Sequence, residues 1–185
     1  MGAWGISAFE ADAGWDALSF IRESLPEDGK LELKQIIEDM RREKWYIPDV
    51  SDGDSHTGPM MLAEIVVKFI DQDISELDYD EEWAEKENKF SAITSFAADK
   101  DSLKWLRGYI SDTLESAKAN AVYRAKHAAY EWDLRGGWRE EQDWLGWQEH
   151  MSTLVNRLDT LISSPDNIVE LNQPQEQVHS PSMDM

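Results

Sequence analysis

The residues of this chain best suited to chemistry lie in one short loop, at Asp49, Asp52, Asp54 and His56. Carboxylates in close quarters shift each other's pKa values, and a histidine nearby exchanges protons near neutral pH. The same oxygen atoms are ligands for hard cations. One candidate function is therefore a small carboxylate- or metal-dependent hydrolase. Because Asp and Gly are also the ordinary residues of turns, a purely structural loop is the alternative.

Two further groups have a spacing that is typical of metal ligands, and both patterns are incomplete. Residues 71–82 are spaced like a calcium-binding EF-hand loop, but Glu76 stands where that loop needs glycine. His127 and His150 fall on two predicted facing helices, yet no His-Glu-x-x-His pattern supports a zinc site. No nucleophile elbow, phosphate-binding loop or dinucleotide fingerprint occurs. We therefore predict no catalytic residue, no metal and no cofactor.

Negative charge is the strongest compositional feature. The chain has 38 Asp and Glu against 18 Lys and Arg, which gives a formal net charge of -20 at pH 7. A field of this sign repels nucleic acid and anionic membranes, and it speeds encounter with cationic proteins. We therefore expect a basic protein partner and no direct binding to nucleic acid or membrane. Charge that serves only solubility is the alternative.

The acidic residues are densest in residues 71–90, and we predict that this segment binds the partner. Its carboxylates would steer encounter and pair with Lys and Arg near the partner's active site, while an aromatic side chain adds a desolvated contact. The predicted partner-binding residues are Asp71, Asp73, Glu76, Asp78, Asp80, Glu81, Glu82 and Trp83.

The size and residue content favour one compact domain. With 185 residues and 41% hydrophobic positions, the chain is long enough to bury one sizeable core. It has no cysteine, which excludes disulfides, thiol catalysis and Cys-ligated zinc. No segment approaches the roughly 20 apolar residues of a membrane span, and no signal-peptide pattern is present. We expect a cytoplasmic protein.

The first sixteen residues are rich in glycine and tryptophan. Glycine permits backbone angles that other residues avoid, and large aromatic side chains can anchor a segment to a core. We therefore predict that the N-terminal segment packs on the core. The residues concerned are Gly2, Gly5, Gly14, Trp4, Phe9 and Trp15.

Helical spacing of apolar residues dominates the first half of the chain. It predicts helices over residues 12–24 and 30–44. Turn-forming residues fill 48–59 and predict a loop, after which Pro59 suits the first turn of a third helix. Since the apolar face of the third helix is unusually wide, we expect it at the centre of the fold.

The second half predicts a pair of long helices. A short helix is predicted over 83–98, and one long helix or two collinear helices over 101–135. The glycine pair at 136–137 can supply a left-handed turn, and a return helix over 138–161 would then pack antiparallel to the long helix. The segment 164–185 is polar and rich in proline, so we expect a mobile tail.

These elements predict an all-α fold. No internal repeat appears, and no β alternation survives beyond about four residues. We expect a single-domain helical bundle over residues 1–163, with a long antiparallel C-terminal helix pair and the N-terminal segment on its core. The aromatic cluster of the second half is expected in that core, with Trp144 as a candidate interface anchor. Its members are Trp132, Trp138, Trp144 and Trp147.

Three stretches carry a resemblance to a known family. They are Met-Gly-x-Trp-Gly with Phe-Glu-x-Asp over residues 1–12, Met-Leu-Ala-Glu-Ile-Val-Val over 61–67, and Trp-Gln-Glu-His-Met-Ser-Thr-Leu-Val-Asn-Arg-Leu over 147–158. In these the chain resembles the bacterial domain of unknown function 4259 family, which has no assigned activity. The resemblance implies a fold and no reaction. Residues 130–134 depart from the family's Ser-Glu-Leu-x-x-Leu-Trp run, so the resemblance does not fix the conformation there.

Charge and the missing catalytic patterns together favour a binding protein. The leading hypothesis is a non-enzymatic acidic protein-binding module, such as an immunity or antitoxin-type protein that neutralises a basic bacterial toxin. The small hydrolase introduced above is one alternative. A third possibility is a mimic of DNA charge that inhibits a nucleic-acid-binding protein.

Overall fold

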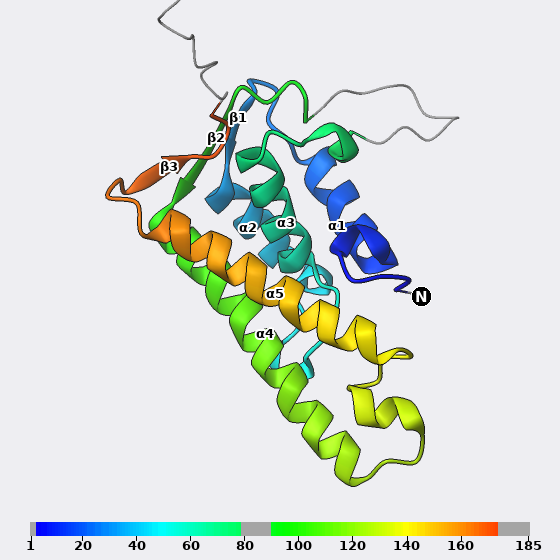
Figure 1. Ribbon diagram of the computed structural model, residues 1–185. Coiled ribbons are helices and arrows are strands. Elements are labelled where there is room, and N and C mark those ends of the chain that lie inside the picture. The colour runs from blue at the N-terminus through cyan, green and yellow to red at the C-terminus, as the bar shows by residue number, and fades with distance from the viewer. Residues whose placement is uncertain (1–2, 79–89, 174–185) are drawn as a thin grey trace, which may run out of the picture.

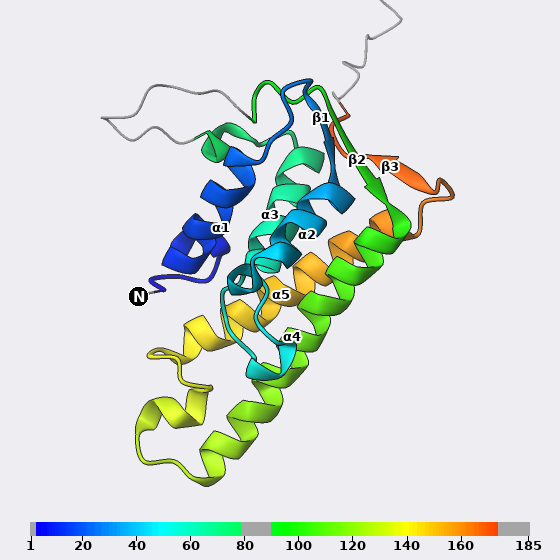
Figure 2. The same ribbon diagram turned by 180° about the vertical axis from the view of Figure 1, so that it is seen from behind.

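The computed structural model of this chain describes residues 3–78 and 90–173 (Figure 1). In these residues the fold is largely helical, and a small sheet lies at one end. The α-helices are α1 (Asp12–Glu23), α2 (Leu33–Arg42), α3 (Gly58–Ile70), α4 (Lys100–Lys126) and α5 (Glu141–Ile162). Helices α4 and α5 lie side by side and run in opposite directions, as predicted (Figures 1 and 2). None of the helices described is long and apolar enough to cross a membrane.

The three-stranded sheet corrects the all-α prediction. Strand β1 (Lys30–Glu32) pairs parallel with β2 (Ser95–Asp99), which pairs antiparallel with β3 (Ile168–Glu170). Strands of three to five residues are too short to show alternation, so their sequence pattern cannot be separated from that of helices. The predicted helix over 30–44 is therefore wrong for its first three residues.

The same sheet corrects two further predictions. Residues 95–98 of the predicted helix 83–98 belong to strand β2, whose Phe96 and Ala98 are fully buried. Residues 83–89 lie outside the described residues. Within the segment expected as a mobile tail, residues 168–170 form β3 and Leu171 is buried in the core. Leu171 thus makes an apolar contact with the core, which the mainly polar composition of residues 164–185 does not indicate.

Helix α3 lies at the centre of the fold, as predicted from its wide apolar face. It packs against α1, α4 and α5 (Figure 1). The Thr57 hydroxyl accepts a hydrogen bond from the Met60 N–H at 3.2 Å, and Pro59 occupies the first turn. Its fully buried apolar side chains include Met60, Met61, Leu62, Ile65, Val66 and Phe69.

The N-terminal segment packs on α1 and α3, but not through Trp4. Ala8 and Ala11 are buried, and the half-buried Trp15 donates a hydrogen bond from Nε1 to the Phe9 carbonyl at 2.7 Å. Trp4 is 62% exposed, so its predicted role as an anchor to the core is wrong. Small side chains instead let the backbone of this segment approach the helices closely.

Gly14 is required for that approach and not for an unusual backbone angle. A Cβ atom on Gly14 would lie 1.7 Å from the Ala8 carbonyl oxygen. Gly136 and Gly137, in contrast, have φ values of 62° and 89°, the left-handed conformation that the sequence predicted.

The long helix predicted over 101–135 ends earlier, at Lys126. The Asp133 carboxylate accepts hydrogen bonds from the Ala129 and Tyr130 N–H groups, both at 3.1 Å, and pairs with Arg124 at 3.0 Å. These bonds hold residues 131–135 in a separate short 3-10 helix, η5 (Glu131–Arg135). Local side-chain bonding to the backbone thus competes with continuation of the helix.

Two helical glycines give a matched test of the N-terminal packing. We expect Gly14→Ala to lower the free energy of unfolding by about 1–3 kcal/mol, because the added methyl group overlaps Ala8. Gly108→Ala in α4 meets nothing within 4 Å and should raise stability by up to about 1 kcal/mol. Urea unfolding followed by circular dichroism measures both. Equal effects at the two positions would contradict this account of the N-terminal segment.

Candidate functional site

A cavity of about 840 Å³ lies between the N-terminal segment, the loop before α3, the C-terminal turns of α4 and the start of α5. Its lining combines aromatic and charged residues. The tryptophans are Trp4, Trp138, Trp144 and Trp147, the acids are Asp52, Asp54, Glu140 and Asp143, and the arginines are Arg124 and Arg139. Four carboxylates against two guanidinium groups leave this cavity with a formal charge of -2.

Three of these tryptophans, Trp138, Trp144 and Trp147, pack together as an aromatic wall. Trp147 is fully buried, and its Nε1 donates a hydrogen bond to the Ser55 carbonyl at 2.7 Å. The Trp144 ring stacks on Trp147 with centroids 5.8 Å apart and planes inclined by 14°, while Trp138 lies 6.0 Å from Trp147. A Cβ on Gly136 would lie 3.0 Å from the Trp144 ring, so this glycine lets the ring fold inward.

The predicted aromatic core is therefore right for Trp147 and only partly right for the rest of the cluster. Trp138 and Trp144 are half-buried and line the cavity, so they remain available to a ligand. Trp132 is 44% exposed and stands outside the cavity lining.

The acidic loop of the first prediction is held against α4 (Figure 2). The Asp49 carboxylate accepts a hydrogen bond from the Ser51 N–H at 2.8 Å, caps the 3-10 helix η3 (Val50–Asp52), and is absent from the cavity lining. Gly53 adopts a left-handed conformation close to the backbone of Ala117. Asn120 donates hydrogen bonds to the Asp52 carbonyl and to its neighbour in the loop. These contacts fix Asp52 and Asp54 at the cavity.

The loop carboxyls differ in acidity because their surroundings differ. Hydrogen bonds from Ser51 lower the pKa of Asp49. Partial loss of hydration, together with the negative charge of Asp52, raises the pKa of Asp54. A cation near Asp54 would lower the pKa of this carboxyl and so oppose the shift.

The four cavity carboxylates form no ion pair with any residue that the structure describes. The described residues of the predicted partner-binding segment behave differently. Asp71 pairs with Arg157 of α5, and both Asp73 and Glu76 pair with Lys68 of α3. These three acids are solvent-exposed at the end of α3, where the chain's own cations already neutralise much of their charge.

Asp78 is engaged in the fold. Its side chain is 6% exposed, it accepts hydrogen bonds from the Phe90 and Ser91 N–H groups at 2.8 Å, and it lies 3.8 Å from Arg22. Asp78 thereby links the chain before residue 79 to the chain after residue 89. The other predicted contacts, Asp80, Glu81, Glu82 and Trp83, lie outside the described residues.

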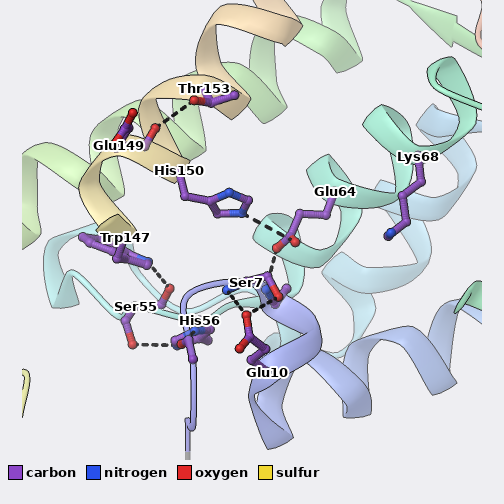
Figure 3. A network of polar contacts seen from close by, with 12 residues as sticks. Ser7, Glu10, Ser55, His56, Glu64, Lys68, Trp147, Glu149, His150 and Thr153 are labelled. Carbon is purple, nitrogen blue, oxygen red and sulfur yellow. Dashed lines mark hydrogen bonds and ion pairs between the residues drawn. The ribbon is translucent and has the colours of Figure 1, made fainter. Parts of the chain in front are cut away.

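A buried polar network lies behind the cavity and connects three parts of the chain (Figure 3). Glu64 of α3 accepts a hydrogen bond from the Ala8 N–H at 2.6 Å and faces His150 of α5 at 3.5 Å. On the N-terminal segment, Glu10 accepts hydrogen bonds from the backbone and hydroxyl of Ser7. The network ties the N-terminal segment to both helices.

His56 completes this region as a buried, neutral side chain. Its Nε2 donates to the Gly5 carbonyl at 3.0 Å, and its Nδ1 accepts from the Ser55 hydroxyl at 2.8 Å. Burial lowers its pKa, although the neighbouring Glu64 opposes the shift. With both ring nitrogens in use, His56 holds the loop to the N-terminal segment and is not placed for the predicted acid-base or metal chemistry.

The remaining metal candidates are also dispersed. Nowhere in residues 3–78 and 90–173 do three or more His, Cys, Asp or Glu side chains form a group that could hold a metal ion. His127 packs against Tyr123 at the C-terminal end of α4, whereas His150 faces Glu64.

Sequence reasoning missed Glu140 and Asp143 as site residues. It identified the acidic loop and the tryptophan cluster separately, but no local pattern shows that the loop packs beside α5. Glu140 and Asp143 sit at the beginning of α5, where carboxylates also stabilise the helix dipole and so look structurally ordinary.

The depressed pKa of His56 predicts a pH-dependent stability. Below about pH 6.5 the unfolded chain takes up a proton on this residue and the folded chain does not, so the free energy of unfolding falls as pH drops. His56→Gln removes the titrating side chain. The free energy of unfolding of this variant should therefore decrease less between pH 7.5 and pH 5.5 than that of the parent chain. His127→Gln, which changes an exposed histidine, serves as the control with the parental pH dependence. Identical pH profiles for the parent and His56→Gln would refute the assignment.

Comparisons with models of known protein families, with curated proteins and with solved structures find no match for this chain. The resemblance to the domain of unknown function 4259 family thus remains a prediction from the sequence. Function has to be inferred from the geometry and charge of the cavity.

Proposed function

We propose that this chain is a non-enzymatic protein-binding module of the immunity or antitoxin type, which neutralises a basic bacterial toxin. The single observation that carries the proposal is the cavity that combines four tryptophans with four carboxylates. Aromatic faces and unpaired carboxylates both attract cationic side chains. A basic protein partner is therefore the best-supported occupant class.

Unpaired charge is what separates the cavity from the rest of the acidic surface. Asp71, Asp73 and Glu76 already have partners within the chain, so a new cation would have to compete with Arg157 or Lys68. Among the described residues none of the cavity acids is in an ion pair, although Arg124 and Arg139 line the same cavity and Arg124 pairs with Asp133. We assign direct contact to the cavity and long-range steering to the net negative charge of the chain as a whole.

Exposed apolar side chains in the elements that line the cavity support a protein partner. They belong to the C-terminal end of α4, to η5 with the residue before it, and to the start of α5, and among them the Tyr130 and Trp132 rings stack with centroids 4.4 Å apart. Exposed aromatic residues of this kind serve as energetic anchors in protein interfaces. These side chains are Val122, Tyr123, Tyr130, Trp132, Leu134 and Leu145.

The proposal can be tested by affinity capture from native lysate with two doubly substituted variants. Asp52→Asn with Asp143→Asn removes two charges from the cavity, and Asp73→Asn with Glu76→Gln removes two charges elsewhere. We expect the parent chain to retain a basic protein at 50 mM salt and to lose it at 500 mM. The cavity variant should bind it at least about tenfold more weakly, because it leaves partner cations unpaired, and the control should bind nearly as the parent does.

The outcomes separate the alternatives. Equal loss in both variants would show that net charge, and not the cavity, governs binding. Failure to retain any basic protein at low salt would overturn the proposal. Displacement of the captured protein by duplex DNA would instead favour the mimicry of DNA charge.

A further inference from the structure

We infer that the cavity binds an arginine side chain of the basic partner, with the guanidinium plane against the tryptophan wall and its N–H groups directed at the carboxylates. This inference rests on the proposed function and names the group that the site recognises. It is argued from the shape of the wall, the placement of the acids, and the chain's own arginine contacts.

The shape of the aromatic wall favours a flat cation. Trp147 is fully buried and backs the wall, so the half-buried Trp144 and Trp138 are its rings within reach of a ligand. The Trp144 plane is inclined by 14° to Trp147, and the Trp138 plane is inclined by 37° to it. A guanidinium group is planar and weakly hydrated, so it stacks on such faces at a low desolvation cost. A lysine ammonium is a compact and strongly hydrated charge that gains less from a flat wall.

The carboxylates come from two separate elements that line the same cavity. Asp52 and Asp54 belong to the loop held against α4, and Glu140 and Asp143 belong to the start of α5. An arginine fork can donate to acceptors in more than one direction at once, which a single ammonium does less well.

The chain itself already uses arginine in this way beside the cavity. Arg124 donates from Nε and Nη2 to Asp133 at 3.2 Å and 3.0 Å, and from Nη1 to the Gly136 carbonyl at 3.4 Å. Elsewhere the Arg41 guanidinium lies 4.9 Å from the centroid of the Trp105 ring. Both kinds of contact, carboxylate and indole, are therefore compatible with the local geometry of this protein.

The cavity is too large for one isolated ion. Its volume of about 840 Å³ falls within the range of roughly 300–1,000 Å³ that is usual for ligand sites. A metal ion would leave most of this space empty, and a phosphate would meet a net negative lining. An arginine that enters with its flanking backbone fits both the volume and the charge.

The inference can be tested with three peptides that differ only in the side-chain head group. They are the capped octapeptides (Gly-Arg)4, (Gly-Lys)4 and (Gly-citrulline)4, in which citrulline keeps the planar shape and lacks the charge. We expect the arginine peptide to bind the full chain about tenfold more tightly than the lysine peptide, and the citrulline peptide not to saturate the site. Isothermal titration calorimetry at constant salt measures all three.

Variants then locate the binding. Asp52→Asn with Asp143→Asn should weaken the arginine peptide about tenfold, and Asp73→Asn with Glu76→Gln should not. Trp144→Leu should reduce the preference for arginine over lysine to about twofold or less, because it removes a flat ring and keeps an apolar side chain. Thermal melts confirm that each variant is folded, and the three peptides on the parent chain test selectivity even where a variant unfolds.

The possible failures are distinguishable. Equal binding of the arginine and lysine peptides would overturn the inference and leave a general cation site, which the proposed function permits. Arginine-selective binding that the cavity variant does not change would also overturn it, because the site would then lie elsewhere. Selective binding in the cavity, with no basic protein captured from lysate, would support the inference and contradict the proposed function.

Discussion

The burial of the Glu64 carboxylate is the constraint on which the rest of the arrangement depends. A charged group inside a central helix is tolerable only if polar partners reach it. Its partners here are the Ala8 N–H and His150, which belong to the N-terminal segment and to α5. Satisfying one carboxylate therefore fixes two distant parts of the chain against α3, and the cavity lies beside that junction.

The loop before α3 depends on the same junction. His56 donates to the Gly5 carbonyl, and Trp147 donates to the Ser55 carbonyl, so the N-terminal segment and α5 both hold the loop. These hydrogen bonds hold the loop in place, so the positions of Asp52 and Asp54 are fixed although both residues belong to a loop. A preorganised set of carboxylates costs a ligand less ordering entropy than a mobile set does. The polar network would thus favour the proposed binding without contacting the partner.

The sequence predicted features that have a long and repeated pattern, and it failed where structure depends on distant contacts. Helix α3 was foreseen as the central helix because its apolar residues surround it, and the glycine pair 136–137 was foreseen as a left-handed turn. The pattern of residues 30–32 does not distinguish strand β1 from helix, since three residues carry no period that separates the two. The sequence indicates the acids of the loop as candidate site residues but not those of α5. No local sequence pattern shows which segments of the chain lie side by side.

The order of the sheet affects when this protein can fold. Its strands come from residues 30–32, 95–99 and 168–170, three distant parts of the chain. During synthesis on the ribosome, β3 can pair with β2 only after all of α4 and α5 has been made. Until then the Phe96 carbonyl lacks the hydrogen bond that the Leu171 N–H donates at 2.7 Å, and contacts between such distant segments form slowly. One edge of β2 therefore stays open to pairing with strands of other molecules during this interval, which is when the chain is most prone to aggregate.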